Sequence, residues 1–413
     1  MSNKKIFILY QCSYLVLFLQ SMHVWFLWGN FFKIVCPLFF LIIAFFNRKV
    51  NSRYYQKYTS KGRVLFALIV LFIAITDTFD AGVLSICKSL VDILALLELT
   101  KLSRIAIVKL LRFLTKSFGV ISMVSLVGWI LFLVGVDLPN SYIVDEEFGY
   151  SFQNYYIFLY NMLGLLPRFC SVFLEPGYYG QLSAILLFAN KMKLNNMYLI
   201  AIFLGNLLSL SLAGYILVVL GFIFTFANRI SLLKISVFSI ILFGAVVFSV
   251  NYNKGDNPVN NLIFARLEIN DGKLAGDDRT TESLDIYLAT TFLKSGKYLF
   301  GVGSSFTKMD WGHGVAGYKV YLIRNGFVGF FLAILGYIIM LFRYKKVSLS
   351  MKLCFILFML MYWQAAYPYW FSFFSIYIFT LGAFSLETFS ICRASKSKNL
   401  SSLNVKMDKS SPC

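Results

Sequence analysis

The chain has 413 residues, of which 59% are hydrophobic and 14% are charged, and its mean hydropathy is +0.73. This composition excludes an ordinary water-soluble domain, because no soluble core hides so much apolar surface. The net charge of +19 would suggest nucleic acid as a partner of a soluble protein, but the basic residues stand here in short clusters between apolar runs, a pattern that indicates membrane topology.

The first part of the chain alternates apolar runs with basic segments. Membrane-spanning helices are expected over residues 6–28, 31–46, 64–80, 82–99 and 118–136. The segments between the second and third runs, and between the fourth and fifth, contain bases and no acid. The positive-inside rule therefore predicts that both are cytoplasmic loops. The first run is expected to remain as a helix, because no convincing cleavage site follows it.

The middle of the chain is expected to return to the periplasm through an acidic loop at residues 137–147. One crossing with an irregular start is expected within 155–190, a tight hairpin around SLSLAGY from the runs 197–212 and 214–227, and another crossing at 235–250. The stretch 251–317 is polar and mixes acids with bases. It is predicted to be the one large periplasmic loop.

The last runs, at 319–342, 352–366 and 369–391, complete an all-α polytopic membrane protein with about twelve transmembrane helices and one large periplasmic loop. The predicted organisation is the first nine helices in 1–250, the loop in 251–317, the last three helices in 318–391 and a cytoplasmic tail in 392–413. Both termini are expected in the cytoplasm. The cysteines form no CxxC pair and none lies in the long loop, so neither a disulfide framework nor a metal site is expected.

Charged residues inside apolar segments are costly and are therefore functional candidates. The sequence PRFCSVFLEPGYYGQ places Arg168 and Glu175 on either side of an irregular helix start at Pro176. The donor fork of an arginine at such a position suits a phosphate group. The alternative is that Arg168 and Glu175 neutralise one another or extend to the lipid headgroups. Five charged residues of the third and fourth runs can pair with one another and are assigned mainly to packing, topology or a lateral polar groove: Asp77, Asp80, Lys88, Asp92 and Glu98.

The long loop and the run after it contain the other candidates. Arg266 and Arg279 precede the glycine-rich GVGSSF, which lacks the spacing of the dinucleotide fingerprint. Its glycines are interpreted as turn residues, with direct phosphate contact as the alternative. His313 lies between glycines, where a neutral imidazole can act as a general base on a sugar hydroxyl or be simply solvated. Arg324 stands inside an apolar run and needs an acidic partner or an anionic ligand.

These features, in this order along most of the chain, resemble the O-antigen polymerase (Wzy) family. The resemblance is carried by Arg168, Glu175, Pro176, Gly177 and Gly180, then SLSLAGY, then a late periplasmic loop with GVGSSF, then His313 and a helix with Gly326 and Gly329. It implies the fold of the lipid-linked glycan polymerases and ligases in the inner membrane of Gram-negative bacteria.

The activity implied by the resemblance is that of a glycosyltransferase in lipopolysaccharide biosynthesis, which joins oligosaccharide repeat units carried on undecaprenyl diphosphate at the periplasmic face. It implies no cofactor, nucleotide sugar, metal or nucleic acid. Its other partners are membrane lipid and, from the same pathway, a chain-length regulator and a flippase. Diphosphate or glycan binding falls to Arg168, Arg279, Arg324 and Arg266, and the role of general base falls to His313, with Glu175 as the alternative.

Two rival functions remain open. The O-antigen flippase (Wzx) is also a basic, aromatic-rich chain of about twelve helices, but a flippase needs only short connections. The long loop at 251–317 therefore favours the polymerase. The O-antigen ligase shares the loop and the topology, and it transfers the finished polymer to the lipid A core.

Overall fold

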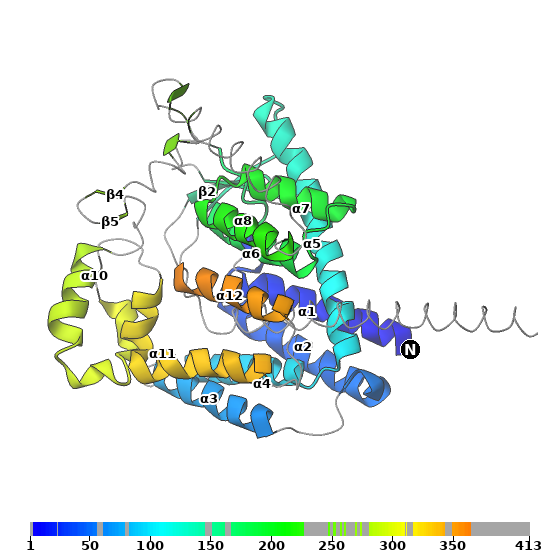
Figure 1. Cartoon of the computed structure of the whole chain (residues 1–413). Coiled ribbons are helices and arrows are strands. Elements are labelled where there is room, and N and C mark those ends of the chain that lie inside the picture. Colours follow the sequence, from blue (N-terminus) through cyan, green and yellow to red (C-terminus); the bar gives the residue numbers. More distant parts are fainter. Residues whose placement is uncertain are drawn as a thin grey trace, which may run out of the picture.

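The computed structural model describes residues 3–22, 24–55, 61–78, 82–144, 151–161, 167–226, 247, 251–252, 257, 260–261, 269–270, 273–274, 281–309, 311, 317–342 and 349–364. The described part is mostly helical (Figure 1). The first half contains α1 (Asn3–Ser21), α2 (Asn30–Val50), α3 (Lys61–Thr78), α4 (Val83–Thr100) and α5 (Arg104–Leu133), with short 3₁₀ turns η1 (Trp25–Leu27) and η2 (Ser52–Tyr54).

The second half contains α6 (Pro176–Ala189), α7 (Met197–Leu208), α8 (Leu212–Phe226), α10 (Glu282–Ile286), α11 (Tyr318–Phe342) and α12 (Leu349–Gln364). Between α10 and α11 lie a π-helical stretch, η6 (Tyr287–Phe292), and the 3₁₀ turns η7 (Gly296–Tyr298) and η8 (Gly303–Lys308). The predicted apolar runs that fall on described residues are therefore helices. The predicted crossing at 235–250, apart from residue 247, and the predicted last crossing and tail at 369–413 lie outside the described residues.

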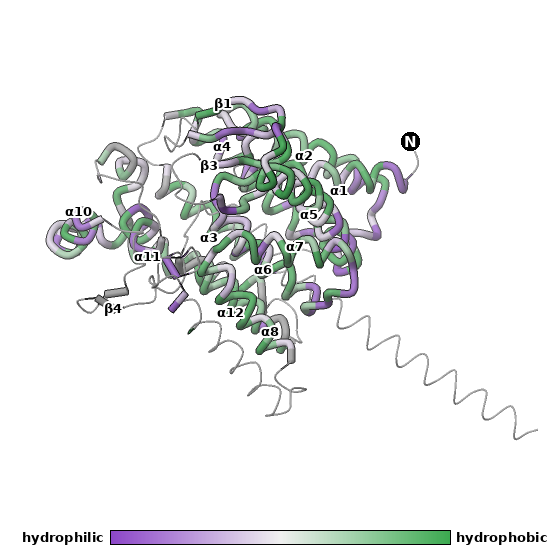
Figure 2. The backbone as a smooth tube through the Cα atoms, turned by 90° about the horizontal axis from the view of Figure 1, so that it is seen from above, coloured by the Kyte–Doolittle hydropathy of each residue, from purple (hydrophilic) through white to green (hydrophobic). Residues whose placement is uncertain are grey.

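Within the described part, three helical segments are long and apolar enough to cross a membrane: Phe31–Val50, Arg104–Leu133 and Tyr318–Met340. Shorter apolar helices accompany them at Met197–Leu208, Leu212–Thr225 and Lys352–Met361. Figure 2 shows the hydrophobic colour along α2, α8 and α12. The number of about twelve crossings stays a prediction.

The helix α5 shows how the outward surface is built. On one face, Val120, Val124, Val127 and Leu131 are exposed, and Val127 is 60% exposed. The opposite face buries Phe118 and Trp129 together with two serines, Ser122 and Ser125. An outward face that is more apolar than the inward face would be unfavourable in water and suits a lipid surrounding. The structure is thus consistent with membrane-spanning character.

The second basic segment is not the predicted loop but the start of a helix, while its cytoplasmic side stays a prediction. Residues 104–116, with Arg104, Lys109, Arg112 and Lys116, form the first turns of α5 and continue without interruption into its apolar part. The connection from α4 to α5 consists of residues 101–103 alone. Helix-forming Leu, Lys and Arg make the segment a helix, and charge reports only which side of the membrane it faces.

The chain is not entirely α-helical either. Strands β1 (Ser141–Val144), β2 (Ser151–Asn154) and β3 (Leu159–Asn161) form an antiparallel sheet in the order β1-β2-β3, and the register pairs Ser141 with Asn154. A second hairpin pairs β4 (Ile269–Asn270) with β5 (Lys273–Leu274). The acidic loop predicted after α5 therefore includes one strand of a small sheet, because alternating side chains over a few residues favour strand pairing.

The helices pack as two connected groups (Figure 1). The helices α6, α7 and α8 contact one another and α5, while α11 packs against α3 and carries η6, η7 and η8 on its first turns. The short helix α12 contacts α6 and α8 on one side and α11 on the other. A large apolar core runs through both groups and includes residues of α1, α3, α11 and α12, and a smaller one joins α10, η8 and the start of α11.

Among the charged residues of the third and fourth runs, Glu98 pairs with bases outside these runs rather than with a charge on them. Its carboxylate binds the Lys101 ammonium at 2.5 Å and the Arg48 guanidinium at 3.8 Å. Both partners come from the basic segments that flank the helices. The side chains of Asp77 and Asp80 lie outside the described residues, and Asp92 is buried on α4.

Candidate functional site

The first candidate region is the irregular segment 167–175, which connects the small sheet to α6. Backbone hydrogen bonds fix it on two sides: Phe169 N donates to Leu208 O at 3.0 Å, and Trp25 N donates to Val172 O at 3.4 Å. Phe169 and Phe173 are fully buried. Ser171 has a positive φ of 54°, a conformation that a non-glycine residue adopts at a cost. The packing on both sides therefore holds the irregular backbone in place.

Arg168 binds the end of α7. Its Nε donates to Ser209 O at 3.1 Å and its Nη2 donates to Leu210 O at 2.8 Å. The last carbonyls of a helix lack partners within the helix and carry partial negative charge, so a guanidinium stabilises them. Ser209 and Leu210 begin the SLSLAGY hairpin. The structure thus joins two motifs that the sequence presents separately, and it gives the half-buried Arg168 a structural task.

Glu175 stands at the start of α6. Its backbone is extended (φ −132°, ψ 146°), as the residue before a proline prefers, and Pro176 takes the first helical position. The Glu175 carbonyl accepts from Tyr178 N at 3.2 Å, and its side chain makes no capping bond to α6. The half-buried carboxylate is therefore placed at the positive end of a helix, on the same segment as Arg168.

Glycines let α6 and α8 approach closely behind this segment. A Cβ on Gly214 would lie 2.9 Å from Gly180 Cα, and a Cβ on Gly180 would lie 2.7 Å from Ser211 Cβ. Asn206 Nδ2 donates to Gly180 O at 2.7 Å. Contact through small residues and interhelical amide bonds is typical of helix packing in membranes. Gly180, three residues after the EPG turn, and the SLSLAGY hairpin thus belong to one packed unit, which we call the Arg168 unit (residues 167–183 with 205–214).

The second candidate region lies where the glycine-rich loop meets α11. Gly301 and Gly303 have positive φ angles of 83° and 60°, so the interpretation of the GVGSSF glycines as turn residues is confirmed. A Cβ on Gly301 would lie 2.2 Å from Arg324 O. Val302 N donates to Ile323 O and Val328 N donates to Leu299 O, both at 3.0 Å. The loop therefore pairs with the backbone of α11 directly beside Arg324.

The reason for this pairing is a break in α11. Gly326 has φ 68° and ψ 177°, so the helix predicted as continuous consists of two helical pieces. The break exposes backbone groups of α11, and the loop residues Leu299 and Val302 satisfy them. A Cβ on Gly326 would lie 2.3 Å from Leu299 O, so a residue with a side chain would clash with the loop at this position. Arg324 is half-buried two residues before the break. We call this arrangement the Arg324 unit (residues 299–303 with 323–328).

The described flanks of two other candidates belong to the same neighbourhood. Arg279 precedes Thr281, whose hydroxyl caps α10 by accepting from Leu284 N, and His313 follows Trp311. Ser283 Oγ donates to Trp311 O at 3.2 Å, and Lys319 on α11 binds Asp285 on α10 at 2.8 Å. Arg279, His313 and Arg266 themselves lie outside the described residues.

Two buried asparagines were missed by reasoning from the sequence. Asn325, beside Arg324, is 2% exposed, and Asn206 in the Arg168 unit is fully buried. Among the described residues, no donor reaches either side-chain Oδ1. A buried amide oxygen without a donor costs about 1–3 kcal/mol, so each of these side chains is an exception to the usual pairing of buried polar groups. The sequence feature that could have identified both residues is an asparagine within an apolar run.

The three predicted site residues that the structure describes therefore fall into two separate units. Arg168 and Glu175 lie with the SLSLAGY hairpin, and Arg324 lies with the GVGSSF loop. The two units stand on different helices, with α12 in contact with both groups (Figure 1). No group of three or more His, Cys, Asp or Glu side chains that could hold a metal ion occurs in the part of the chain that the structure describes. Comparison with known protein families, with curated proteins and with solved structures finds no match to this chain.

Proposed function

We propose that this protein is an O-antigen polymerase, a polytopic inner-membrane glycosyltransferase that joins undecaprenyl-diphosphate-linked repeat units at the periplasmic face. The observation that carries the proposal is the pairing of separated motifs. Arg168 binds the hairpin that follows α7, and the GVGSSF loop binds the backbone at Arg324. Two pairs of motifs that are in contact across about 40 and about 20 residues of sequence are more informative than the same motifs considered singly.

The proposed glycosyl transfer requires two kinds of side chain, namely cations that stabilise the leaving group and a base that accepts a proton. The bond between the anomeric carbon of the donor glycan and the diphosphate oxygen breaks, and the same carbon forms a bond to a hydroxyl of the acceptor sugar. The leaving diphosphate is stabilised by fixed positive charge, which Arg168 and Arg324 supply, with Arg279 and Arg266 from the long loop. The acceptor hydroxyl gives its proton to a base, His313 or alternatively Glu175.

The pairing of the glycine-rich loop with a broken helix also favours this function over a flippase. A break such as that at Gly326 places non-helical backbone within an apolar segment, which membrane proteins use where the backbone is buried or lines a cavity. The partner that satisfies this backbone here is part of the long loop. A flippase with short connections has no such segment, whereas a polymerase or a ligase has one.

The test is the lipopolysaccharide of a strain that lacks the gene. A polymerase deletion leaves a lipid A core with a single repeat unit, and complementation restores the ladder of lengths. A core without any repeat, together with accumulated lipid-linked polymer, identifies a ligase instead. Accumulation of single lipid-linked units on the cytoplasmic face identifies a flippase. Either of these last two results would contradict the proposal.

A further inference from the structure

A second basic site lies far along the chain from both units, at the start of α1. A cavity of about 570 Å³ opens between α1, η2 and the first turns of α5. Five cationic side chains line it: Lys4, Arg53, Lys109, Arg112 and Lys116. The remaining lining residues are Phe7, Ile8, Gln11, Tyr54 and Phe113. We call this cavity the basic groove.

Helical periodicity builds the two walls. Lys4, Phe7, Ile8 and Gln11 recur at the spacing that puts residues on one face of α1, and Lys109, Arg112, Phe113 and Lys116 repeat the same spacing on α5. Gln11 Nε2 donates to Lys109 O at 3.1 Å and ties the walls together. The faces of α1 and α5 that line the groove thus each combine apolar side chains with cationic ones.

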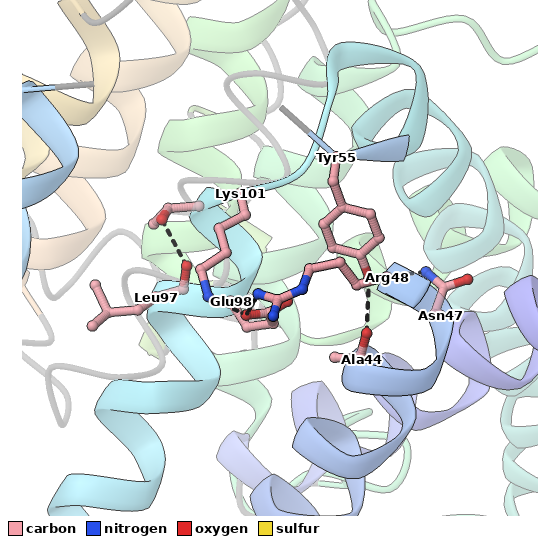
Figure 3. A network of polar contacts seen from close by, with 8 residues as sticks. Ala44, Asn47, Arg48, Tyr55, Leu97, Glu98 and Lys101 are labelled. Atoms are coloured by element: carbon pink, nitrogen blue, oxygen red, sulfur yellow. Dashed lines mark hydrogen bonds and ion pairs between the residues drawn. The ribbon is translucent and has the colours of Figure 1, made fainter. Parts of the chain in front are cut away.

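No carboxylate of the chain segments that form the groove balances these cations. The first acid in the sequence is Asp77, and no acid occurs between Glu98 and Asp137. Glu98 is already engaged by Lys101 and Arg48, as Figure 3 shows. The lining residues include no acid. The groove therefore concentrates positive charge for an anion that is not part of these segments.

Tyr54 forms the polar floor. Its hydroxyl oxygen accepts from Lys109 Nζ at 2.6 Å and from Arg53 Nη2 at 3.3 Å, and the ring is 5% exposed. The hydrogen bond from Lys109, aided by the charges of Lys109 and Arg53, lowers the pKa of this phenol although burial opposes the shift. Both lone pairs of the oxygen are used, and among the described residues no acceptor is recorded for its own O–H. The O–H is therefore available to donate to a bound anion.

Apolar groups in the same groove identify the kind of anion. Ile8 is 45% exposed, and Phe113 is half-buried next to the cations. A free phosphate would use the cations alone, whereas a lipid would use the cations for its headgroup and the apolar side chains for its first methylene groups. Basic clusters of this kind next to membrane helices are also the recognition pattern for anionic headgroups.

We propose that the basic groove binds the phosphate headgroup of an anionic phospholipid, with Lys4, Lys109, Arg112 and Lys116 around the phosphate and Tyr54 donating to one of its oxygens. The site belongs to the face opposite the proposed reaction, because the positive-inside rule puts these segments in the cytoplasmic half. It is independent of whether the protein is a polymerase, a ligase or a flippase.

The test measures lipid retention by native mass spectrometry of the purified full-length protein, incubated with phosphatidylglycerol or phosphatidylcholine. The wild type is expected to retain phosphatidylglycerol preferentially. The double variant Arg112→Gln/Lys116→Gln is expected to lose roughly tenfold in apparent affinity, since each cation near an anionic headgroup contributes appreciably. The matched control Lys49→Gln/Lys193→Gln removes the same charge from exposed positions outside the groove and is expected to change the affinity by less than about twofold.

Equal losses in both double variants would overturn the proposal, since they would show that overall charge alone attracts the lipid. Displacement of phosphatidylglycerol by millimolar inorganic phosphate would also overturn it, because the groove would then be a soluble-phosphate site. If the double variant does not fold, Lys4→Gln at an exposed position of the first turn replaces it. An unchanged affinity of Lys4→Gln would count against the groove, and a loss of severalfold would support it.

Discussion

The Arg168 unit and the Arg324 unit both place an arginine on irregular backbone beside glycines, but the two arginines are held in opposite ways. In the first, the side chain fixes the backbone, because the Arg168 guanidinium binds Ser209 O and Leu210 O at the end of α7. In the second, the backbone fixes the residue, because the loop at Gly301 packs on the Arg324 carbonyl and bonds to Ile323 and Val328.

This difference teaches how each residue must be tested. Removing the Arg168 side chain disturbs a helix end and any ligand binding at the same time. Removing the Arg324 side chain leaves the loop contacts intact, since they are made by backbone atoms. The contacts between the loop and α11 therefore do not depend on the Arg324 side chain, whereas the contact at the end of α7 depends on the Arg168 side chain.

The largest effect is expected for Gly301→Ala. The added methyl carbon would lie 2.2 Å from Arg324 O, on a residue whose φ is 83°. We expect a loss of at least about 2 kcal/mol in the free energy of unfolding, because strained backbone and a clash with backbone atoms add together. Thermal unfolding of the purified protein in detergent measures it.

Gly296→Ala is the control for this substitution. It lies on the same loop, its φ is not in the left-handed region, and a Cβ there would meet no atom within 4 Å. It should leave the melting temperature nearly unchanged. Equal melting temperatures for the two variants would show that the loop does not depend on its contact with α11.

The second comparison uses lysine at both arginines. Arg168→Lys keeps the charge but loses the two-point contact with Ser209 O and Leu210 O, so we expect about 1.5–3 kcal/mol of lost stability. Arg324→Lys should cost less than about 1 kcal/mol, since the loop binds the backbone, and should shorten or abolish the glycan ladder. Unfolding of the purified variants and gels of the complemented deletion strain measure the two effects.

The opposite result would exchange the roles of the two residues. If Arg324→Lys were the less stable variant and Arg168→Lys were stable but inactive, Arg168 would be the better candidate for diphosphate binding. The distinction between the two ways of holding an arginine would then be wrong.

The smallest effect is expected for the ion pair that ties α10 to the second unit. Lys319 and Asp285 lie 2.8 Å apart, with side chains 20% and 34% exposed. A double-mutant cycle with Lys319→Ala and Asp285→Ala should give a coupling of about 0.5 kcal/mol, because solvent screens a partly exposed pair. A coupling above about 2 kcal/mol would mean that this pair, rather than the glycine loop, holds α10 on α11.

Much of the helical layout was predictable from the sequence, and much of the site was not. The apolar runs found α1–α4, α7, α8 and α12 within several residues, since long apolar segments must be helical at membrane depth. The same approach treated residues 101–116 as a loop, because charge says which side a segment faces and nothing about its backbone. It also predicted α11 as one continuous helix, since the sequence alone does not show whether a glycine within an apolar run will interrupt the helix.

At the site, the sequence identified Arg168, Glu175 and Arg324 as unusual, because charged groups in apolar surroundings are rare. It did not predict that Arg168 would bind the SLSLAGY hairpin, because the contact spans 41 residues of chain. The roles of His313, Arg279 and Arg266 stay predictions, as these residues lie outside the described part. The asparagines at 206 and 325 were not predicted as site residues. An amide oxygen without a hydrogen-bond donor is unusual only where it is buried, and burial is known only from the structure.

The sequence by itself determined the character of the protein: helices with an apolar outer surface, basic segments next to apolar runs and a few costly charges in apolar surroundings. These follow from local composition, which acts wherever the chain lies. The tertiary structure alone decided which of those features meet. It bound Arg168 to the end of α7, seated the glycine-rich loop on the break in α11 and closed the basic groove from α1, η2 and α5. Such contacts depend on packing between distant segments, which composition does not encode locally.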